Sequence, residues 1–492
     1  MYSIGFTKKA SKGFLFGCAL SLMSSAVFAD ENTLCLKSEL KTHPQNVLSC
    51  FVNSDSSTPA SWKLEKSEYR KEAALTVYTY TLTSQFWPDK TISNSGRDWK
   101  HTLVLYVPDH VTSTQSFLYI NGGTRFEEKG KSNPKPAKVD FEGLVKATQS
   151  VVADLQDIPD QYLSFDDGIA RREDGIVAYT WNKYMDDPEK NAYWPAHLPM
   201  TKAVVKAMDM IQSEADVRHY QKPTDFVLSG ASKRGWTAWL TTIVDNRVNG
   251  IIPIVIDILN TKKNLLHIKK SLNAWPLAFH DYEAQGVTKR MDTLEFDKLM
   301  SIEDPIAYLS YPKYASRLAV PKYIINASSD DFFVPDSYLQ YAKALPGETV
   351  LRILPNQRHY IDYSIVNKAL IEYYTLFINK LPRPDVRWNA SKDNQSINVT
   401  TNFEPIKATL WEGYNPKDRD FRIYPAKMEY KQTQITGVCI EQKCVYKLAP
   451  ITTTTGYTSR FIEFVYDDGS NRLVTTSPAF ITPNTYPQPN SQ

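Results

Sequence analysis

The chain has 492 residues, of which 42% are hydrophobic and 23% are charged, and its formal net charge at pH 7 is +3. This composition is that of a globular protein with room for one large domain and a small one. A protein with so little net charge has no excess of positive charge to attract phosphate groups, which argues against nucleic acid and anionic membranes as main partners.

The N-terminus predicts a secretory signal peptide over residues 1–29. Three lysines precede an uncharged apolar run over residues 13–28, and the run ends in small residues at Ala29. A transmembrane anchor is the alternative, but the run is short for a bilayer span. A lipoprotein box at Cys18 is also conceivable, although few apolar residues precede that cysteine. We expect an exported protein, periplasmic or secreted, with no membrane span and a formal charge of zero once the three lysines are removed.

Four cysteines remain after residue 29, in two close pairs. Cys35 and Cys50 lie in an N-terminal segment, residues 30–60, and Cys439 and Cys444 lie near the C-terminus. An even number of cysteines behind a signal peptide predicts two disulfides within the pairs, with other connectivities open. A metal site at the second pair is the alternative, but no His-Cys pair with zinc spacing accompanies it. We therefore expect neither a metal nor any other cofactor.

Residues 61–380 alternate between strand and helix patterns. Alternating polar and β-branched or aromatic residues predict edge strands at Ala74–Leu82 and His101–Val107. Short apolar runs predict buried parallel strands at Ser116–Ile120, Ser150–Leu155, Thr224–Ser229, Gly250–Ile256, Val320–Ala327 and Thr349–Leu354. Apolar residues at helical spacing predict helices at Pro199–Ile211, Tyr338–Ala344 and Val366–Ile378. This alternation predicts an α/β protein with a doubly wound, mostly parallel sheet.

Three further regions depart from this rhythm. Insertions near 157–194 and 260–315 are candidates for lids or substrate walls, with plain surface elaboration as the alternative. After a proline-rich hinge, residues 381–482 show short alternating runs, such as Gln434–Ile440, that predict a small β-sandwich. Residues 483–492 form a polar tail.

A candidate nucleophile lies between a strand and a helix. The sequence Gly230-Ala-Ser232-Lys-Arg-Gly235-Trp follows a buried strand and precedes an apolar helix, as in the nucleophile elbow of an α/β hydrolase. The usual elbow has glycine two places after the serine, whereas here Arg234 stands there and glycine comes one place later.

A candidate acid and base follow Ser232 in the order that this fold requires. Asp330 comes just after the strand ending at Ala327, and His359 comes just after the strand ending at Leu354. A serine, a carboxylate and an imidazole in this order predict a Ser-Asp-His triad on an α/β-hydrolase fold. Asp331 is the alternative acid. Each of the three also has a structural reading, as a helix cap, a turn residue or a surface histidine.

The oxyanion hole of such a site needs two backbone N–H groups. Lys233, directly after the nucleophile, would supply one. Gly123, in the loop Asn121-Gly-Gly-Thr124, would supply the other because glycines let the backbone approach a ligand closely. An ordinary tight turn is the alternative for this loop.

Several segments resemble the PhoPQ-activated pathogenicity-related protein family, which includes autocrine proliferation repressor-like proteins. They are WPAHLPMTKAVVKAMD at 194–209, GASKRGWTAW at 230–239, VDNRV at 244–248, DDFFVPDS at 330–337 and RDFR at 419–422. The resemblance implies an α/β-hydrolase fold with an immunoglobulin-like C-terminal domain. The elbow also resembles that of glucuronoyl esterases, which implies that Lys233 and Arg234 face a carboxylate on the substrate, although a structural role for Arg234 is favoured.

Together these features predict an exported serine hydrolase that cleaves an ester or amide of a small molecule or peptide through an acyl-enzyme. Carboxylesterase activity is favoured over peptidase activity because nothing marks a peptide-binding groove. The alternative is a secreted signalling or binding protein that keeps the scaffold with little or no catalysis. In either case the C-terminal domain is a candidate surface for a protein or glycan partner.

Overall fold

The computed structural model describes residues 35, 37–90, 92–126, 133–452 and 455–488. The predicted signal peptide lies outside the described residues. Within these ranges, none of the helices combines the length and the hydropathy that crossing a bilayer requires.

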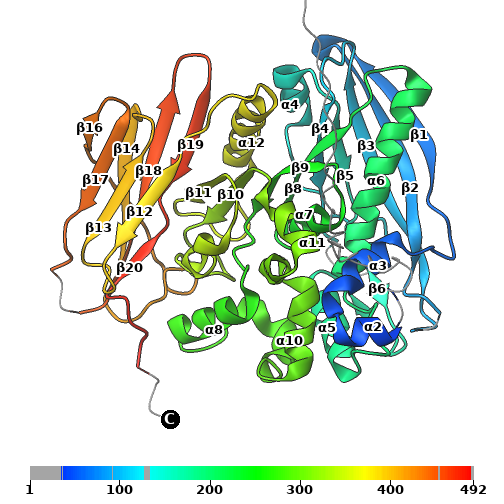
Figure 1. Ribbon diagram of the computed structural model, residues 1–492, viewed down its shortest axis with the longest axis horizontal. Helices are drawn as coiled ribbons and strands as arrows, with labels where there is room; N and C mark the ends of the chain where they lie inside the picture. The colour runs from blue at the N-terminus through cyan, green and yellow to red at the C-terminus, as the bar shows by residue number, and fades with distance from the viewer. Residues whose placement is uncertain (1–34, 36, 91, 127–132, 453–454, 489–492) are drawn as a thin grey trace, which may run out of the picture.

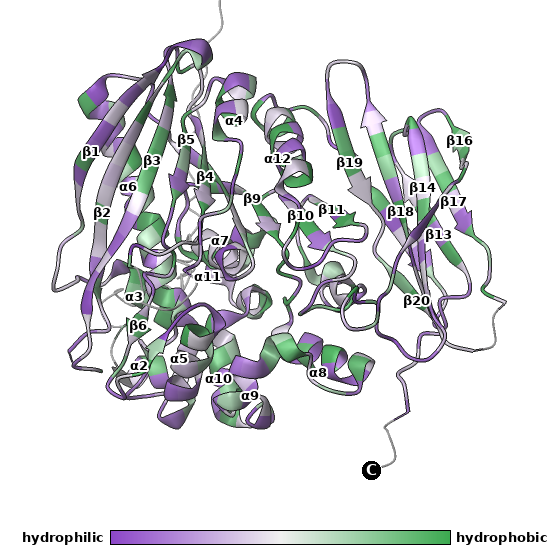
Figure 2. Ribbon diagram, turned by 180° about the vertical axis from the view of Figure 1, so that it is seen from behind, coloured by the Kyte–Doolittle hydropathy of each residue, from purple (hydrophilic) through white to green (hydrophobic). Residues whose placement is uncertain are grey.

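The large domain is built on one sheet of nine strands. In spatial order these are β1 (Ser61–Arg70), β2 (Leu75–Trp87), β3 (Arg97–Pro108), β5 (Val152–Leu155), β4 (Gln115–Ile120), β8 (Asp225–Ala231), β9 (Val248–Ile254), β10 (Lys322–Ala327) and β11 (Thr349–Leu354). The first three are antiparallel to their neighbours, and all strands from β5 to β11 are parallel. From β2 onward this is the strand order of the α/β-hydrolase fold, with β1 added at the edge. Figure 2 shows β1 as mostly hydrophilic and the central strands as hydrophobic.

Successive side chains of each central strand enter different cores, because neighbouring side chains in a strand point to opposite faces. On one face, Tyr323 and Ile325 of β10 pack in a core with helices α4 (Phe141–Thr148) and α12 (Tyr363–Ile378). On the other face, Ile324 joins a larger core with helices α6 (His197–Arg218) and α7 (Lys233–Val244). Helix α6 runs in front of the sheet in Figure 1 and beyond it in Figure 2. The parallel strands are therefore buried on both sides.

The two insertions form one helical layer at the carboxyl ends of the strands. The first contains a short hairpin, β6 (Leu163–Ser164) with β7 (Ala170–Arg171), and helix α5 (Asp174–Asp186). The second contains helices α8 (Thr261–Leu272), α9 (His280–Ala284), α10 (Leu294–Glu303) and α11 (Pro312–Ala315). The helix predicted at Tyr338–Ala344 is instead two short 3₁₀ turns, Ser337–Gln340 and Ala342–Ala344. The buried hydroxyl of Tyr341 between these turns donates to Asp257, so tertiary contacts determine this conformation.

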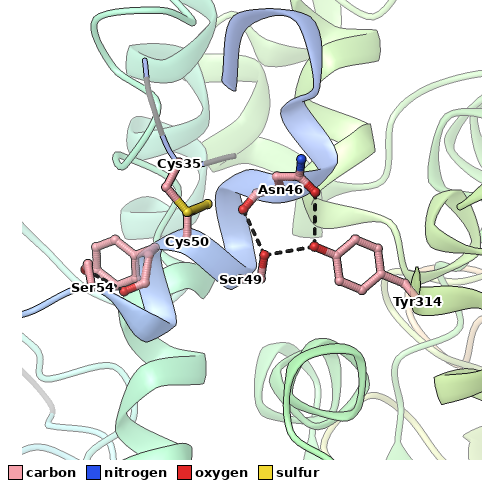
Figure 3. Close-up of a disulfide and its surroundings, with 7 residues drawn as sticks. Cys35, Asn46, Ser49, Cys50, Ser54 and Tyr314 are labelled. Atoms are coloured by element: carbon pink, nitrogen blue, oxygen red, sulfur yellow. Dashed lines mark hydrogen bonds between the residues drawn. A yellow bond between two sulfur atoms is a disulfide. The ribbon is translucent and has the colours of Figure 1, made fainter. Parts of the chain in front are cut away.

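The N-terminal segment is folded against this layer. It contains helices α2 (Lys37–Thr42) and α3 (Val47–Asn53), and a disulfide joins Cys35 to Cys50 as predicted. Figure 3 shows Ser49 between Asn46 and Tyr314. The Ser49 hydroxyl lies 2.8 Å from that of Tyr314, which also donates to Asn46. Because Tyr314 belongs to α11, these contacts join the beginning of the chain to the second insertion.

The C-terminal region is a β-sandwich of two antiparallel sheets, as predicted. One contains β12 (Val386–Ala390), β13 (Ile397–Thr401), β17 (Lys443–Leu448) and β16 (Val438–Ile440). The other contains β15 (Lys431–Gln434), β14 (Lys407–Asn415), β18 (Tyr457–Asp467) and β19 (Arg472–Thr476), and β20 (Phe480–Thr482) also pairs with β18. The second predicted disulfide, Cys439–Cys444, joins facing residues of β16 and β17.

The single strand predicted at Gln434–Ile440 is wrong. The chain leaves β15 at Gln434 and enters the opposite sheet at Val438, so the two halves of the range belong to different sheets. Gly437 makes this crossing next to Tyr446, whose ring would lie 2.7 Å from a Cβ at that position. A side chain at residue 437 would therefore collide with the core of the sandwich.

Candidate active site

Ser232 occupies a sharp turn between β8 and α7. Its φ of 57° lies in the left-handed region, which is uncommon for a residue with a side chain. The Ser232 N–H donates to the carbonyl of Ile254 at 2.8 Å, and this bond fixes the turn to the neighbouring strand β9. The hydroxyl thus stands at the end of the sheet on a rigid, strained turn.

The irregular glycine spacing around Ser232 has a steric cause. A Cβ at Gly235 would lie 2.7 Å from the carbonyl oxygen of Gly230, where the helix crosses the end of the strand. A Cβ at Gly230 would lie 2.9 Å from backbone atoms of Arg234 and from the Ile120 oxygen. The close approach of helix and strand therefore requires glycine at 230 and 235, and it leaves position 234 free for a large side chain.

The three residues predicted as a triad are brought together. The Ser232 Oγ lies 2.9 Å from Nε2 of His359, and Nδ1 of His359 lies 3.0 Å from both carboxylate oxygens of Asp330. Asp330 is only 2% exposed and also accepts the backbone N–H of Phe332 at 2.8 Å. This arrangement holds the carboxylate towards the imidazole and the imidazole towards the serine hydroxyl.

Asp331 has other partners. Its carboxylate lies 2.9 Å from the guanidinium of Arg358, and it accepts the backbone N–H of His359 at 3.4 Å. Of the two aspartates, only Asp330 contacts the imidazole of His359 with its carboxylate. The sequence does not distinguish Asp330 from Asp331 as the acid, because the two neighbours differ only in the direction of their side chains.

The predicted oxyanion residues flank Ser232. Lys233 is the first residue of α7, so its backbone N–H lies in the helix turn that has no intrahelical acceptor. In the loop after β4, the Gly122 N–H donates to the Asn121 side chain, whereas the Gly123 N–H has no acceptor among the described residues. Gly123 has a φ of 124° and lines the same cleft as Ser232.

The basic side chains after the nucleophile point into a buried charge network that sequence reasoning missed. Arg234 donates to both carboxylate oxygens of Glu173 at 2.7 Å, and the Lys233 ammonium lies 2.8 Å from the same carboxylate and 3.2 Å from Asp174. Burial alone would raise the pKa of Glu173, but Arg234 and Lys233 outweigh it and hold that pKa well below its ordinary value. Arg234 therefore has the structural role favoured above. The adjacent acidic pair at 173–174 and the adjacent basic pair at 233–234 are the sequence signal that could have suggested this contact.

A second buried pair that sequence reasoning missed, His197 with Glu303, lies next to Trp236 of α7. Nδ1 of His197 lies 2.6 Å from the Glu303 carboxylate, and both side chains are fully buried. The His197 ring packs against Trp236, with ring centroids 4.9 Å apart, and the Trp236 indole N–H donates to the Glu303 carbonyl. His197 belongs to the segment at 194–209 that resembles the family, and this was its only sequence signal.

The sheet order and the serine on its strand–helix turn define an α/β-hydrolase scaffold. The chain belongs to the PhoPQ-activated pathogenicity-related protein family, whose model matches residues 48–422.

The chain is also similar to individual proteins. Autocrine proliferation repressor protein A of Dictyostelium discoideum is 33% identical over 466 residues, which cover 89% of this chain and 90% of that protein. Among solved structures, acetyl xylan esterase 1 from Thermoanaerobacterium sp. is 12% identical with a TM-score of 0.43, covering 68% of this chain and 92% of that one. A glucuronoyl esterase from Solibacter usitatus is 12% identical with a TM-score of 0.40, covering 70% and 93%.

Proposed function

We propose that this protein is an exported serine hydrolase that cleaves an ester through an acyl-enzyme intermediate. The observation that carries the proposal is the continuous hydrogen-bonded arrangement of Ser232, His359 and Asp330 at the carboxyl ends of the parallel strands. The predicted signal peptide and the two disulfides support export, because disulfides persist in oxidising compartments.

Each residue has a defined role in the proposed reaction. His359 takes the Ser232 proton through Nε2 as Oγ attacks the substrate carbonyl carbon. The backbone N–H groups of Lys233 and Gly123 stabilise the resulting oxyanion, and Asp330 holds the imidazole in the tautomer that accepts this proton. The tetrahedral intermediate then expels the alcohol, which receives the proton from His359. A water molecule, deprotonated by His359, attacks the acyl-enzyme; the bond from the acyl carbon to Ser232 Oγ then breaks, His359 returns the proton to Oγ, and the carboxylic acid leaves.

Labelling with a fluorophosphonate tests this proposal. The purified mature protein should react at Ser232, and both Ser232→Ala and His359→Ala should lose the label while their circular dichroism stays unchanged. Loss of one triad member lowers the rate by at least about a thousandfold. Two exposed residues provide matched controls, and Ser470→Ala and His110→Ala should be labelled like the wild type.

Failure to label a folded wild-type sample would contradict the proposal. That result would instead favour a secreted binding or signalling protein that retains the scaffold, a function suggested by the name of the relative from Dictyostelium discoideum.

A further inference from the structure

Ser232 lines two adjoining hollows of very different volume. On one side is a small chamber of about 40 Å³ between α7 and the two insertions. On the other side is an open cleft of about 1390 Å³ that reaches the loop at Gly123 and the surface around His359. Ser232 and Lys233 line both hollows, so an acyl group on Ser232 has one of them on each side.

The chamber is apolar and its walls are fixed. Trp236 follows Ser232 by one helical turn and packs edge-on against Trp181 of α5, with ring centroids 5.6 Å apart. Tyr282 of the second insertion packs against Trp181 and against Phe279, with ring centroids 5.6 Å apart in both contacts. These four aromatic side chains are all at least nine-tenths buried. Buried, interlocked rings cannot move aside for a long substrate chain without loss of packing.

The volume of the chamber sets the size of the group that it can hold. A cavity needs a volume of about 10–15 Å³ for each group the size of a water molecule that it holds. The chamber, at about 40 Å³, therefore holds about three or four non-hydrogen atoms. Because the carbonyl oxygen faces the oxyanion hole and not the chamber, this allows acyl groups of up to four carbons, from acetyl to butyryl, and a longer chain would collide with the aromatic walls.

The cleft presents polar and charged groups among apolar ones, and most of its charged groups lie next to a charge of opposite sign. Three of its lining guanidinium groups pair with carboxylates at 2.6–2.9 Å, in the pairs Arg171–Asp167, Arg358–Asp331 and Arg422–Asp420. Arg172 lies 6.0 Å from the ring of Tyr162, and Lys135 also lines the cleft. The cations next to Ser232 are likewise bound to Glu173. At the rim, Tyr360 is 87% exposed and Tyr424 is 65% exposed, so each presents a flat ring with a hydroxyl to solvent. Such a surface suits a large, uncharged, polar partner better than an anion.

We propose that the site hydrolyses short-chain acyl esters of bulky, uncharged, polar alcohols, with the acyl group in the chamber and the alcohol in the cleft. This inference rests on the proposed function, because it states where the two parts of the ester bind when Ser232 attacks it. Met291 and Val287, which are buried in the chamber wall, then determine the permitted length of the acyl group.

A series of 4-nitrophenyl esters tests the acyl side. The wild type should have a kcat/KM for acetate and butyrate at least tenfold above that for octanoate. Met291→Ala removes three non-hydrogen atoms from the wall and should raise the octanoate-to-acetate ratio by about fourfold for each methylene admitted. Val287→Phe should lower butyrate hydrolysis more than acetate hydrolysis. Met428→Ala is the matched control outside both hollows, and it should keep the wild-type preference.

A matched pair of sugar esters tests the alcohol side. The methyl ester of peracetylated glucuronic acid should be deacetylated at least several times faster than peracetylated glucuronic acid itself, which differs only in carrying a free carboxylate. Faster hydrolysis of the acid, or octanoate preferred over acetate in a protein whose Ser232 reacts with a fluorophosphonate, would overturn this inference alone. Absence of both hydrolysis and labelling would overturn the proposed function and the inference with it.

Discussion

Replacement of Glu173 by glutamine removes one negative charge and leaves the shape of the side chain almost unchanged. In the wild type this carboxylate accepts hydrogen bonds from Arg234 and Lys233 at the start of α7. Glutamine retains one acceptor oxygen but leaves the two cations with Asp174 as their remaining nearby carboxylate, 3.2 Å from Lys233. The variant therefore removes the charge complementarity next to Ser232 without creating a cavity.

The expected loss of unfolding free energy follows from burial. Arg234 is 10% exposed, Lys233 is 6% exposed and Glu173 is 25% exposed. Removal of one partner from a fully buried ion pair costs about 3–5 kcal/mol. Because a quarter of Glu173 still reaches solvent, we expect about 2–4 kcal/mol for Glu173→Gln at pH 7. Glu189→Gln, which breaks an exposed pair with Lys41, is the matched control and should cost much less, because solvent screens that pair.

The effect should also depend on pH in a defined direction. The folded-state pKa of Glu173 is lowered, whereas an unfolded glutamate titrates near about 4.3. Its contribution to stability is therefore fully present above pH ~4.3 and is lost as the pH falls towards the folded-state pKa. Urea unfolding of the wild type and Glu173→Gln should give a constant difference from pH 7 to pH 5 and a smaller one below pH 4. A Glu173→Gln effect no larger than that of Glu189→Gln, or a difference that does not change down to pH 3, would refute this account.

Two further predictions concern the site and the disulfides. Asp330→Asn should lower kcat by about 10⁴-fold because the imidazole loses its orienting carboxylate, whereas Asp331→Asn should lower it by less than about tenfold; steady-state kinetics that show equal losses would contradict the assignment. Cys35→Ser should cost about 3 kcal/mol of unfolding free energy and Cys439→Ser about 2 kcal/mol, because the first disulfide closes a loop of 15 residues and the second a loop of 5. Urea titrations that rank the two losses in the opposite order would count against a chain-entropy origin.

The local sequence was sufficient for most of the central sheet. Buried parallel strands are short apolar runs, and the ranges predicted for β4, β8, β10 and β11 overlap those observed. The edge strand β1 has no such signal, because its residues are mostly polar and exposed. Its conformation comes from antiparallel pairing with β2. The sequence pattern also does not separate β15 from β16, which belong to different sheets.

The candidate triad was also predictable, since each member follows a recognisable strand and the chain order is that of the fold. The choice between Asp330 and Asp331 was not, because neighbouring aspartates in a loop differ only in the direction of their side chains. The contact of Glu173 with Arg234, 61 residues further along the chain, had no sequence signal beyond an acidic pair at 173–174 and a basic pair at 233–234. It required the first insertion to fold back over the start of α7.

Local patterns in the sequence are enough to predict the central strands, the turn at Ser232 and the order of the acid and base, because these depend on apolar runs, glycines and loop positions. The surroundings of the nucleophile depend on contacts that form only when the chain is folded. The chamber beside Ser232 is assembled from α5, α7 and the second insertion, which are far apart in the sequence. Its size depends on how their aromatic side chains pack together, and packing between distant segments leaves no periodic trace in the sequence.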